Sequence, residues 1–315
     1  MQILTTIFNG LPGTIALGLI WGLMALGVFI TFKVLDIADL TVDGSFCTGG
    51  AVCVVLVTMG VPAPIAILFG FVAGLICGLI TGLFLTVMGI PPILAGILTQ
   101  LMLYSINLLI LGGANMPLPP FAFKLITSMY PLIAILIVCG FAIVITGVLY
   151  WFFGTQIGRG IRATGNNEKM SRAQGINTEL NKVIGLMLSN GIVALSGALL
   201  TEYQGFADIN MGRGAIVIGL AAVIIGNAVL SKFLGNFLVK LISVFLGGII
   251  YYLVYAIVIA MGLPTDLLKM LSAIVVAIFL AVPYWKKKFS KPKLGGAAAL
   301  VEPTVSDGEK GGSDA

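Results

Sequence analysis

Three polar side chains interrupt an apolar block of the sequence near residue 100. They are Gln100, Tyr104 and Asn107, and their i, i+4, i+7 spacing places them on one face of a helix. Amide and phenol groups can hold a neutral or zwitterionic solute by hydrogen bonds, and polar groups in lipid-spanning helices tend to face the bundle interior. The trio is therefore a candidate lining for a solute path. Hydrogen bonding between helices is the simpler explanation for any single polar residue, including three isolated candidates in other blocks, Asn190, Asn227 and Tyr255.

A group of carboxylates stands between the first two apolar blocks. Asp36, Asp39 and Asp43 lie there, and Asp43 is followed by Gly44 and a run of further small residues. Asp43 can cap the helix that follows, and the glycine-rich run beyond it could open the backbone where it lines protein or a cavity. Two interpretations stay open: Asp39, Asp43 and Gly44 form a structural cap, or they belong to a gate on the path.

The longest polar stretch, residues 154–182, carries an ordered series of helix signals. Asn167 can cap a helix, Glu168 suits its positive end, Arg172 falls in its last turn, and Gly175 is placed for a left-handed stop. The series predicts a helix of about two turns. A helix this short is not stable alone in water. We therefore expect it to dock, either on the membrane helices of the same chain or on a partner protein.

The residue types exclude the common enzyme chemistries. The chain has no histidine, which removes the usual general base and the commonest metal ligand. Its four cysteines (Cys47, Cys53, Cys77 and Cys139) are scattered through apolar stretches without a CxxC pair, so they predict buried packing rather than a metal or disulfide site. No GxxxxGK[ST] phosphate loop is present, so we expect no ATP hydrolysis by this chain.

The elements that must position these residues are membrane-spanning helices. Apolar residues make up 59% of the chain and charged residues 9%, whereas soluble domains carry about a quarter charged residues. About 20 apolar residues suffice for a helix to cross the ~30 Å hydrocarbon core. The fold class is therefore predicted as all-α, a polytopic transmembrane bundle of about nine spans. The blocks are 11–32, 45–59, 65–88, 93–111, 130–153, 183–200, 215–230, 238–261 and 267–284.

Basic residues orient these spans. Cytoplasmic flanks are enriched in Lys and Arg, and Lys33, the stretch 154–182 and the lysines of 286–293 all fall on one side if the N-terminus is outside and the C-terminus inside. The net charge of +5 therefore needs no nucleic acid. Residues 1–285 are predicted to form one transmembrane domain with a cytoplasmic loop at 154–182, and 286–315 a basic, then disordered, cytoplasmic tail. Blocks 45–59 and 215–230 are short enough to be broken or re-entrant.

Glycine recurs at helical spacing. The chain holds 41 glycines, and Gly70, Gly74, Gly78 and Gly82 repeat every four residues, which lays a flat groove along one helix face. Tight helix packing is the simpler interpretation of this stripe. Sliding of helices during a transport cycle is the alternative.

Several segments, taken in order, resemble permeases of the branched-chain amino acid and ribose class of ABC importers. They are Asn9-Gly10, residues 21–27, the turn 39–43, Gly49-Gly50-Ala51, and the stretches 162–168, 173–177 and 196–199. The resemblance covers roughly residues 9 to 285. Within the class, segments 35–46 and 94–108 are most similar to a branch of tryptophan/tyrosine and uncharacterised permeases.

The resemblance implies the partners and roles of the chain. It implies a membrane core in the cell membrane that is a homodimer, with a second copy of this permease, or a heterodimer. It also implies two cytoplasmic ATPase subunits that bind ATP and Mg²⁺, and a solute-binding protein outside. This chain would then be non-catalytic and hold no cofactor of its own. The short helix would seat in a groove of the ATPase, with Arg162, Asn167, Glu168, Lys169, Arg172 and Gly175 as the coupling residues.

The solute remains open at this point. None of the candidate path residues carries a charge, which favours a neutral or zwitterionic solute. The family branch implies an amino acid, aromatic ones among them, while branched-chain amino acids, nucleosides and sugars stay as alternatives. A secondary transporter or a passive channel is the competing class. No internal repeat is evident, and the carboxylates fall at span ends, which weakens the case for proton or sodium coupling.

Overall fold

The computed structural model describes residues 2–119, 124–230 and 235–260, together with positions 270, 273, 274, 277 and 281. Within these residues the chain is almost entirely helical, with ten α-helices, one π-helical segment and two three-residue strands. The all-α prediction is therefore confirmed. The predicted tail at 286–315 lies outside the described residues.

Among the residues that the structure describes, seven helices are long and apolar enough to cross a membrane. They are α1 (Gln2–Phe29, continued by the π-helical segment η1, Ile30–Val34), α2 (Thr41–Thr58), α3 (Ala63–Thr86), α4 (Pro92–Leu111), α5 (Pro131–Gly154), α8 (Thr178–Gln204) and α10 (Phe237–Ala260). Of the nine predicted spans, block 215–230 forms the shorter α9 (Ala215–Val229), and block 267–284 lies outside the described residues except for isolated positions.

Proline and glycine set the ends of these helices. α4 and α5 begin at Pro92 and Pro131, where the missing N–H of proline would be unpaired in any case. α4 and α8 end at Gly112 and Gly205, whose φ values of 66° and 82° are left-handed and suit glycine. The predicted boundaries of the described spans agree with the observed ones to within five residues, except that α1 begins at Gln2 and not near residue 11.

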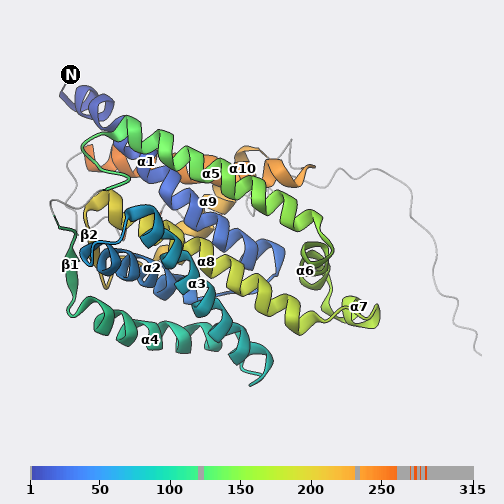
Figure 1. Ribbon diagram of the computed structural model, residues 1–315. Coiled ribbons are helices and arrows are strands. Elements are labelled where there is room, and N and C mark those ends of the chain that lie inside the picture. The colour runs from blue at the N-terminus through green and yellow to red at the C-terminus, as the bar shows by residue number, and fades with distance from the viewer. Residues whose placement is uncertain are drawn as a thin grey trace, which may run out of the picture.

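The two ends of the bundle differ. Strand β1 (Asn115–Pro117) pairs antiparallel with β2 (Phe206–Asp208) at one end, with Met116 opposite Ala207. Helices α6 (Gln156–Asn166) and α7 (Glu168–Ala173) lie at the opposite end (Figure 1). We refer to these as the sheet end and the α7 end.

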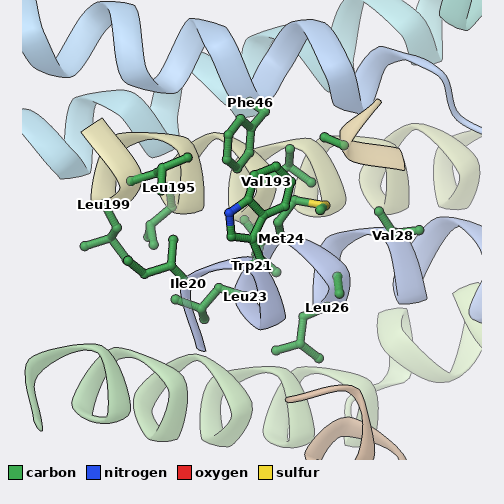
Figure 2. Close-up of a cluster of buried hydrophobic side chains, with 14 of the residues drawn as sticks. Ile20, Trp21, Leu23, Met24, Leu26, Val28, Phe46, Val193, Leu195 and Leu199 are labelled. Carbon is green, nitrogen blue, oxygen red and sulfur yellow. The ribbon is translucent and has the colours of Figure 1, made fainter. Parts of the chain in front are cut away.

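α1 runs through the middle of the bundle, and its side chains form much of the core. Trp21 stacks in a tilted geometry on Phe46 of α2, with 5.0 Å between ring centroids. Figure 2 shows this ring among Ile20, Met24 and Val193, all buried. α1 contacts α5, α8, α9 and α10, while α2 and α3 pack mainly on α8, so α1 and α8 together form the centre of the bundle.

The predicted glycine stripe lies where α3 meets α8. A Cβ built at Gly74 would overlap the backbone at Asn190, and one at Gly78 would overlap the backbone at Leu186. At Gly82 it would lie 3.0 Å from the Cα of Val183. Gly70, the first residue of the stripe, faces Gly49 of α2 and Ala198 of α8. The stripe therefore allows backbone-to-backbone contact along most of the length of α3.

α2 is a continuous helix, and this corrects one expectation. The run Gly49-Gly50 does not open its backbone, because α2 is helical from Thr41 to Thr58. A Cβ at Gly49 would overlap the carbonyl of Ala194, so the small residues serve close packing on α8.

α2 and α9 both begin inside the bundle instead of at its ends. Ser45, in the second turn of α2, donates a hydrogen bond of 2.7 Å to Asn190 at the middle of α8. Asp43, in the first turn of α2, contacts the start of α9. With 15 residues, α9 extends about 22 Å, short of the ~30 Å hydrocarbon core. It therefore crosses only part of the bundle, in line with the prediction of a broken or re-entrant segment.

Candidate functional site

The predicted polar trio lines a cavity near the start of α9. The cavity has a volume of about 230 Å³, and its walls come from α2, α4 and the turn before α9. Its lining residues include Gln100, Tyr104, Asn107, Asp43, Gly44, Cys47 and Arg213. The structure thus brings all three members of the trio together with two of the three gate candidates. We call this the polar cavity.

Asn107 carries an unused hydrogen-bonding group in this cavity. Its side chain is only 1% exposed, and its amide nitrogen donates to the carbonyl of Gly44 at 3.3 Å. Its Oδ1 atom has no hydrogen-bond partner within the described part of the chain. A buried acceptor without a partner is costly, so an N–H or O–H group of a bound solute or a water would satisfy it.

Asp43 caps a helix, but a different one from that predicted. Its carboxylate accepts the backbone N–H groups of Gly214 and Ile216 at 2.9 and 3.0 Å, which closes the N-terminus of α9. At the start of α2 the N-cap residue, Leu40, makes no side-chain cap, and Asp39 just before it accepts the N–H of Thr41 at 2.9 Å. The sequence suggested the local cap because the partner of Asp43 lies 171 residues away.

Asp39 and Asn190 form a buried network apart from the polar cavity. The Asn190 amide donates to Asp39 at 2.7 Å and accepts from Ser45, and both residues are at most 2% exposed. Asn190 also donates to the carbonyl of Leu186 at 3.0 Å, so its side chain is used within the protein and joins α2 to α8. Asn227 lies elsewhere again, where it accepts a 3.5 Å hydrogen bond from Ser243.

Arg213 is the residue that sequence analysis missed. It lines the polar cavity and also a second cavity of about 430 Å³, and it is the one residue common to the two linings. The second cavity is rich in aromatic residues, and among its lining residues are Trp21, Tyr251, Tyr252 and the predicted path residue Tyr255. We call it the aromatic cavity. Arg213 makes no ion pair within 4.0 Å among the described residues, although its charge acts on Asp43.

One signal in the sequence could have identified Arg213. It stands between Gly212 and Gly214, just ahead of an apolar block too short to cross a bilayer. A charge at the start of such a block is placed near the middle of the membrane, where ionisable residues are rare and usually functional.

The helix at 167–173 forms as its capping signals predicted. Asn167 accepts the N–H of Met170 at 3.0 Å, α7 spans Glu168–Ala173, and Gly175 has a φ of 79°. Glu168 holds α7 on α8 by an ion pair of 2.7 Å with Lys182, and Arg172 reaches Glu168 at 3.1 Å. The hydrogen bond from Lys182 is the main reason that the pKa of Glu168 is lowered from its ordinary value.

The predicted coupling residues do not all gather at α7. Lys169 and Arg172 are exposed on it. Arg162 instead belongs to α6, and its guanidinium lies over the ring of Phe237 in α10, 4.8 Å from the centroid. The structure therefore separates Arg162 from the other five.

These features together define a class of protein. Within the described part of the chain, a bundle of seven candidate membrane spans, with a short helix that begins inside the bundle beside polar and aromatic cavities, is the architecture of a membrane transport protein. The chain belongs to the family of the permease components of branched-chain amino acid transport systems, whose model matches residues 11–281. The family resemblance deduced from the sequence is thereby confirmed.

Sequence similarity to individual proteins supports the same family. The chain is 36% identical to the tyrosine transport system permease protein of Clostridioides difficile, over 87% of this chain and 91% of the relative. It is 33% identical to an uncharacterised protein of Rickettsia prowazekii, over 82% and 92%. Similarity to the autoinducer 2 import system permease LsrC of Salmonella choleraesuis is lower, 26% over 65% of this chain and 59% of the relative. No solved structure matches the chain.

Family membership settles the general role. The chain is the non-catalytic transmembrane subunit of an ABC-type transport system in a membrane, and it carries no cofactor of its own. Membership also implies an ATPase and a solute-binding protein as partners.

Proposed function

We propose that this chain forms the translocation path of an ATP-driven importer for an amino acid, with an aromatic amino acid such as tyrosine as the preferred solute. One observation carries the proposal: Arg213, directly before the start of α9 that Asp43 caps, lines both the polar and the aromatic cavity. A guanidinium binds a carboxylate in a two-pronged geometry, and the carboxylate is the group that all amino acids share.

The two cavities suit the rest of such a solute. The unpaired Oδ1 of Asn107 can accept a hydrogen bond from an ammonium group. The rings of Trp21, Tyr252 and Tyr255 offer faces on which an aromatic side chain can stack. The name of the C. difficile relative, a tyrosine permease at 36% identity, supports this solute class.

We further propose how the subunit is arranged. The N-terminus and the sheet end face outward, where the solute-binding protein delivers its cargo, and the α7 end faces the cytoplasm. Basic residues support this orientation, since Lys33, Arg159, Lys169 and Lys182 all lie at or near the α7 end. Residues 1–285 form the permease domain, and two copies of it enclose the path.

α7 is the proposed contact with the ATPase. It is pinned to α8 by Glu168, so a force on α7 is passed to a membrane helix. Its outward side presents Met170, which is 60% exposed, between Lys169 and Arg172. An exposed apolar side chain rimmed by charges suits a protein partner, because the charges set its register.

Uptake by proteoliposomes that contain the chain and its ATPase tests the solute class. With the solute-binding protein present, we expect uptake of a labelled aromatic amino acid and none of a sugar or nucleoside. Arg213→Gln removes a hydrogen bond to a charged group, which lowers uptake by roughly tenfold to a hundredfold. Arg213→Lys keeps the charge and retains part of the uptake.

The outcomes separate the parts of the proposal. Full uptake by Arg213→Gln would reject Arg213 as the carboxylate ligand. Uptake of a sugar or nucleoside in place of amino acids would reject the solute class. Basal ATP hydrolysis in the Arg213→Gln complex serves as the control for assembly, and we expect it to equal that of the unaltered complex.

A further inference from the structure

A cavity lined by basic side chains lies at the α7 end, away from the polar and aromatic cavities. It has a volume of about 740 Å³ and is enclosed by the end of α1, η1, α6 and the start of α10. Four basic side chains line it, against the single carboxylate of Asp36: Lys33, Arg159, Arg162 and Lys240. We call it the basic cavity.

Among the described residues, Asp36 is the only acidic side chain that lines this cavity beside its four basic ones. Within the described residues, none of the four basic side chains makes an ion pair within 4.0 Å. Lys240, the fourth residue of α10, is half-buried, and the guanidinium of Arg162 lies over the ring of Phe237. Placing several like charges around one cavity is unfavourable unless an anion neutralises them.

An apolar and aromatic surface continues from the basic cavity toward the lipid. A neighbouring cavity of about 600 Å³ shares Arg162 and Phe237 with it and is also lined by Tyr150 and Trp151 of α5. Trp151 is 70% exposed. Val144 lies seven residues before it and Val148 three residues before it, and both are also well exposed. These three side chains lie on one face of α5, at the spacing of successive helical turns.

We propose that the basic cavity binds the headgroup of an anionic phospholipid whose acyl chains lie along this face of α5. Basic pockets between membrane helices bind such headgroups, and exposed Trp and Tyr mark the level of the headgroups at the membrane surface. A phosphate group would meet Arg159, Arg162 and Lys240, while the hydrocarbon would cover Val144 and Val148. The ATPase is a less suitable occupant because the aromatic and aliphatic surface next to the cavity belongs to a membrane-spanning helix.

Native mass spectrometry of the purified full-length chain tests this site. The probes are phosphatidylglycerol, zwitterionic phosphatidylcholine of the same chain length, and inorganic phosphate. We expect retention of phosphatidylglycerol alone. Each basic residue contributes on the order of a fivefold gain in affinity for anionic lipid, so Arg162→Gln with Lys240→Gln lowers phosphatidylglycerol affinity about thirtyfold.

Two further variants make the result specific. Lys124→Gln with Lys169→Gln removes the same number of positive charges outside the basic cavity, and we expect it to retain the lipid fully. Arg162→Lys with Lys240→Arg keeps the charges in place and retains most of the affinity, which separates loss of charge from loss of folding.

Three results would overturn the proposal. One is equal retention of phosphatidylglycerol by the Arg162→Gln/Lys240→Gln variant and the unaltered chain. Another is displacement of the lipid by millimolar inorganic phosphate, which would show a site for the free anion. The third is an Arg162→Gln/Lys240→Gln variant that retains the lipid but no longer binds the ATPase, which would make this surface a contact with the ATPase.

Discussion

The contact between α3 and α8 can be tested by adding one methyl group. In Gly74→Ala the new Cβ overlaps the carbonyl oxygen of Asn190 and lies 2.9 Å from the Cα of Gly191. Neither atom belongs to a side chain that can turn away, so the two helices must separate locally. Overpacking of this kind costs about 1–3 kcal/mol, whereas alanine in place of an interior helical glycine returns up to about 1 kcal/mol.

A matched control isolates the packing effect. Gly147 lies in the interior of α5, and a methyl group added there would meet no atom within 4 Å, so Gly147→Ala gains helix propensity without a clash. After the gain in helix propensity is subtracted, we expect Gly74→Ala to lower the free energy of unfolding by about 1–2 kcal/mol and Gly147→Ala to raise it by up to about 1 kcal/mol. Gly82→Ala, whose Cβ meets Val183 at 3.0 Å, falls between them.

Equilibrium unfolding of the purified chain in mixed micelles of dodecyl maltoside and dodecyl sulfate measures these differences. The reasoning is refuted if Gly74→Ala and Gly147→Ala unfold at the same dodecyl sulfate fraction. If Gly74→Ala is stable but transports slowly, sliding of α3 along α8 becomes the better interpretation of the stripe.

Three further results are expected. Asp43→Asn removes a charged acceptor from the start of α9 and lowers the free energy of unfolding by about 1–3 kcal/mol. Asp36 serves as the control because it is exposed and has a φ of 56° that asparagine tolerates, so Asp36→Asn changes the free energy of unfolding little. Equal thermal unfolding of the two variants would contradict the capping role of Asp43. Glu168→Ala combined with Arg172→Ala lowers the amount of solute carried per ATP hydrolysed in proteoliposomes, and an unchanged ratio would reject α7 as the coupling element. Lys182 lowers the pKa of Glu168 below its ordinary value of 4.5, so the ion pair stabilises α7 fully above pH 4.5 and is lost as the pH falls through the lowered pKa. We therefore expect hydrogen exchange of amides 168–173, corrected for intrinsic rates, to rise over that acidic range in the unaltered chain. In Glu168→Gln the corrected exchange stays constant over the same range.

Local signals in the sequence predicted the local structure well. The i, i+4, i+7 spacing of Gln100, Tyr104 and Asn107 depends only on helix geometry, and the structure places all three on one cavity. The cap at Asn167 and the stop at Gly175 likewise depend on neighbouring residues alone. Such features are readable because each is decided within a few residues of the chain.

Contacts between segments that are distant in the sequence could not be predicted from it. Asp43 caps α9 across 171 residues, and nothing near it in the sequence distinguishes that role from a cap on its own helix. Arg213 carries one local signal, its place between two glycines just ahead of a short apolar block. Its position next to Asp43 depends on the contact between α2 and α9, and residues close to it in the sequence do not indicate that contact.

The buried network of Asn190 has a consequence for energy transfer between the two ends of the molecule. α7 is tied to α8 by Glu168, α8 is tied to α2 by Asn190, and α2 holds the start of α9, and so Arg213, through Asp43. If this linkage lets ATP binding by an ATPase docked on α7 alter the affinity of Arg213 for a solute, thermodynamics requires the reverse as well. A solute seated at Arg213 must then change, by the same factor, how tightly the ATPase subunits hold ATP.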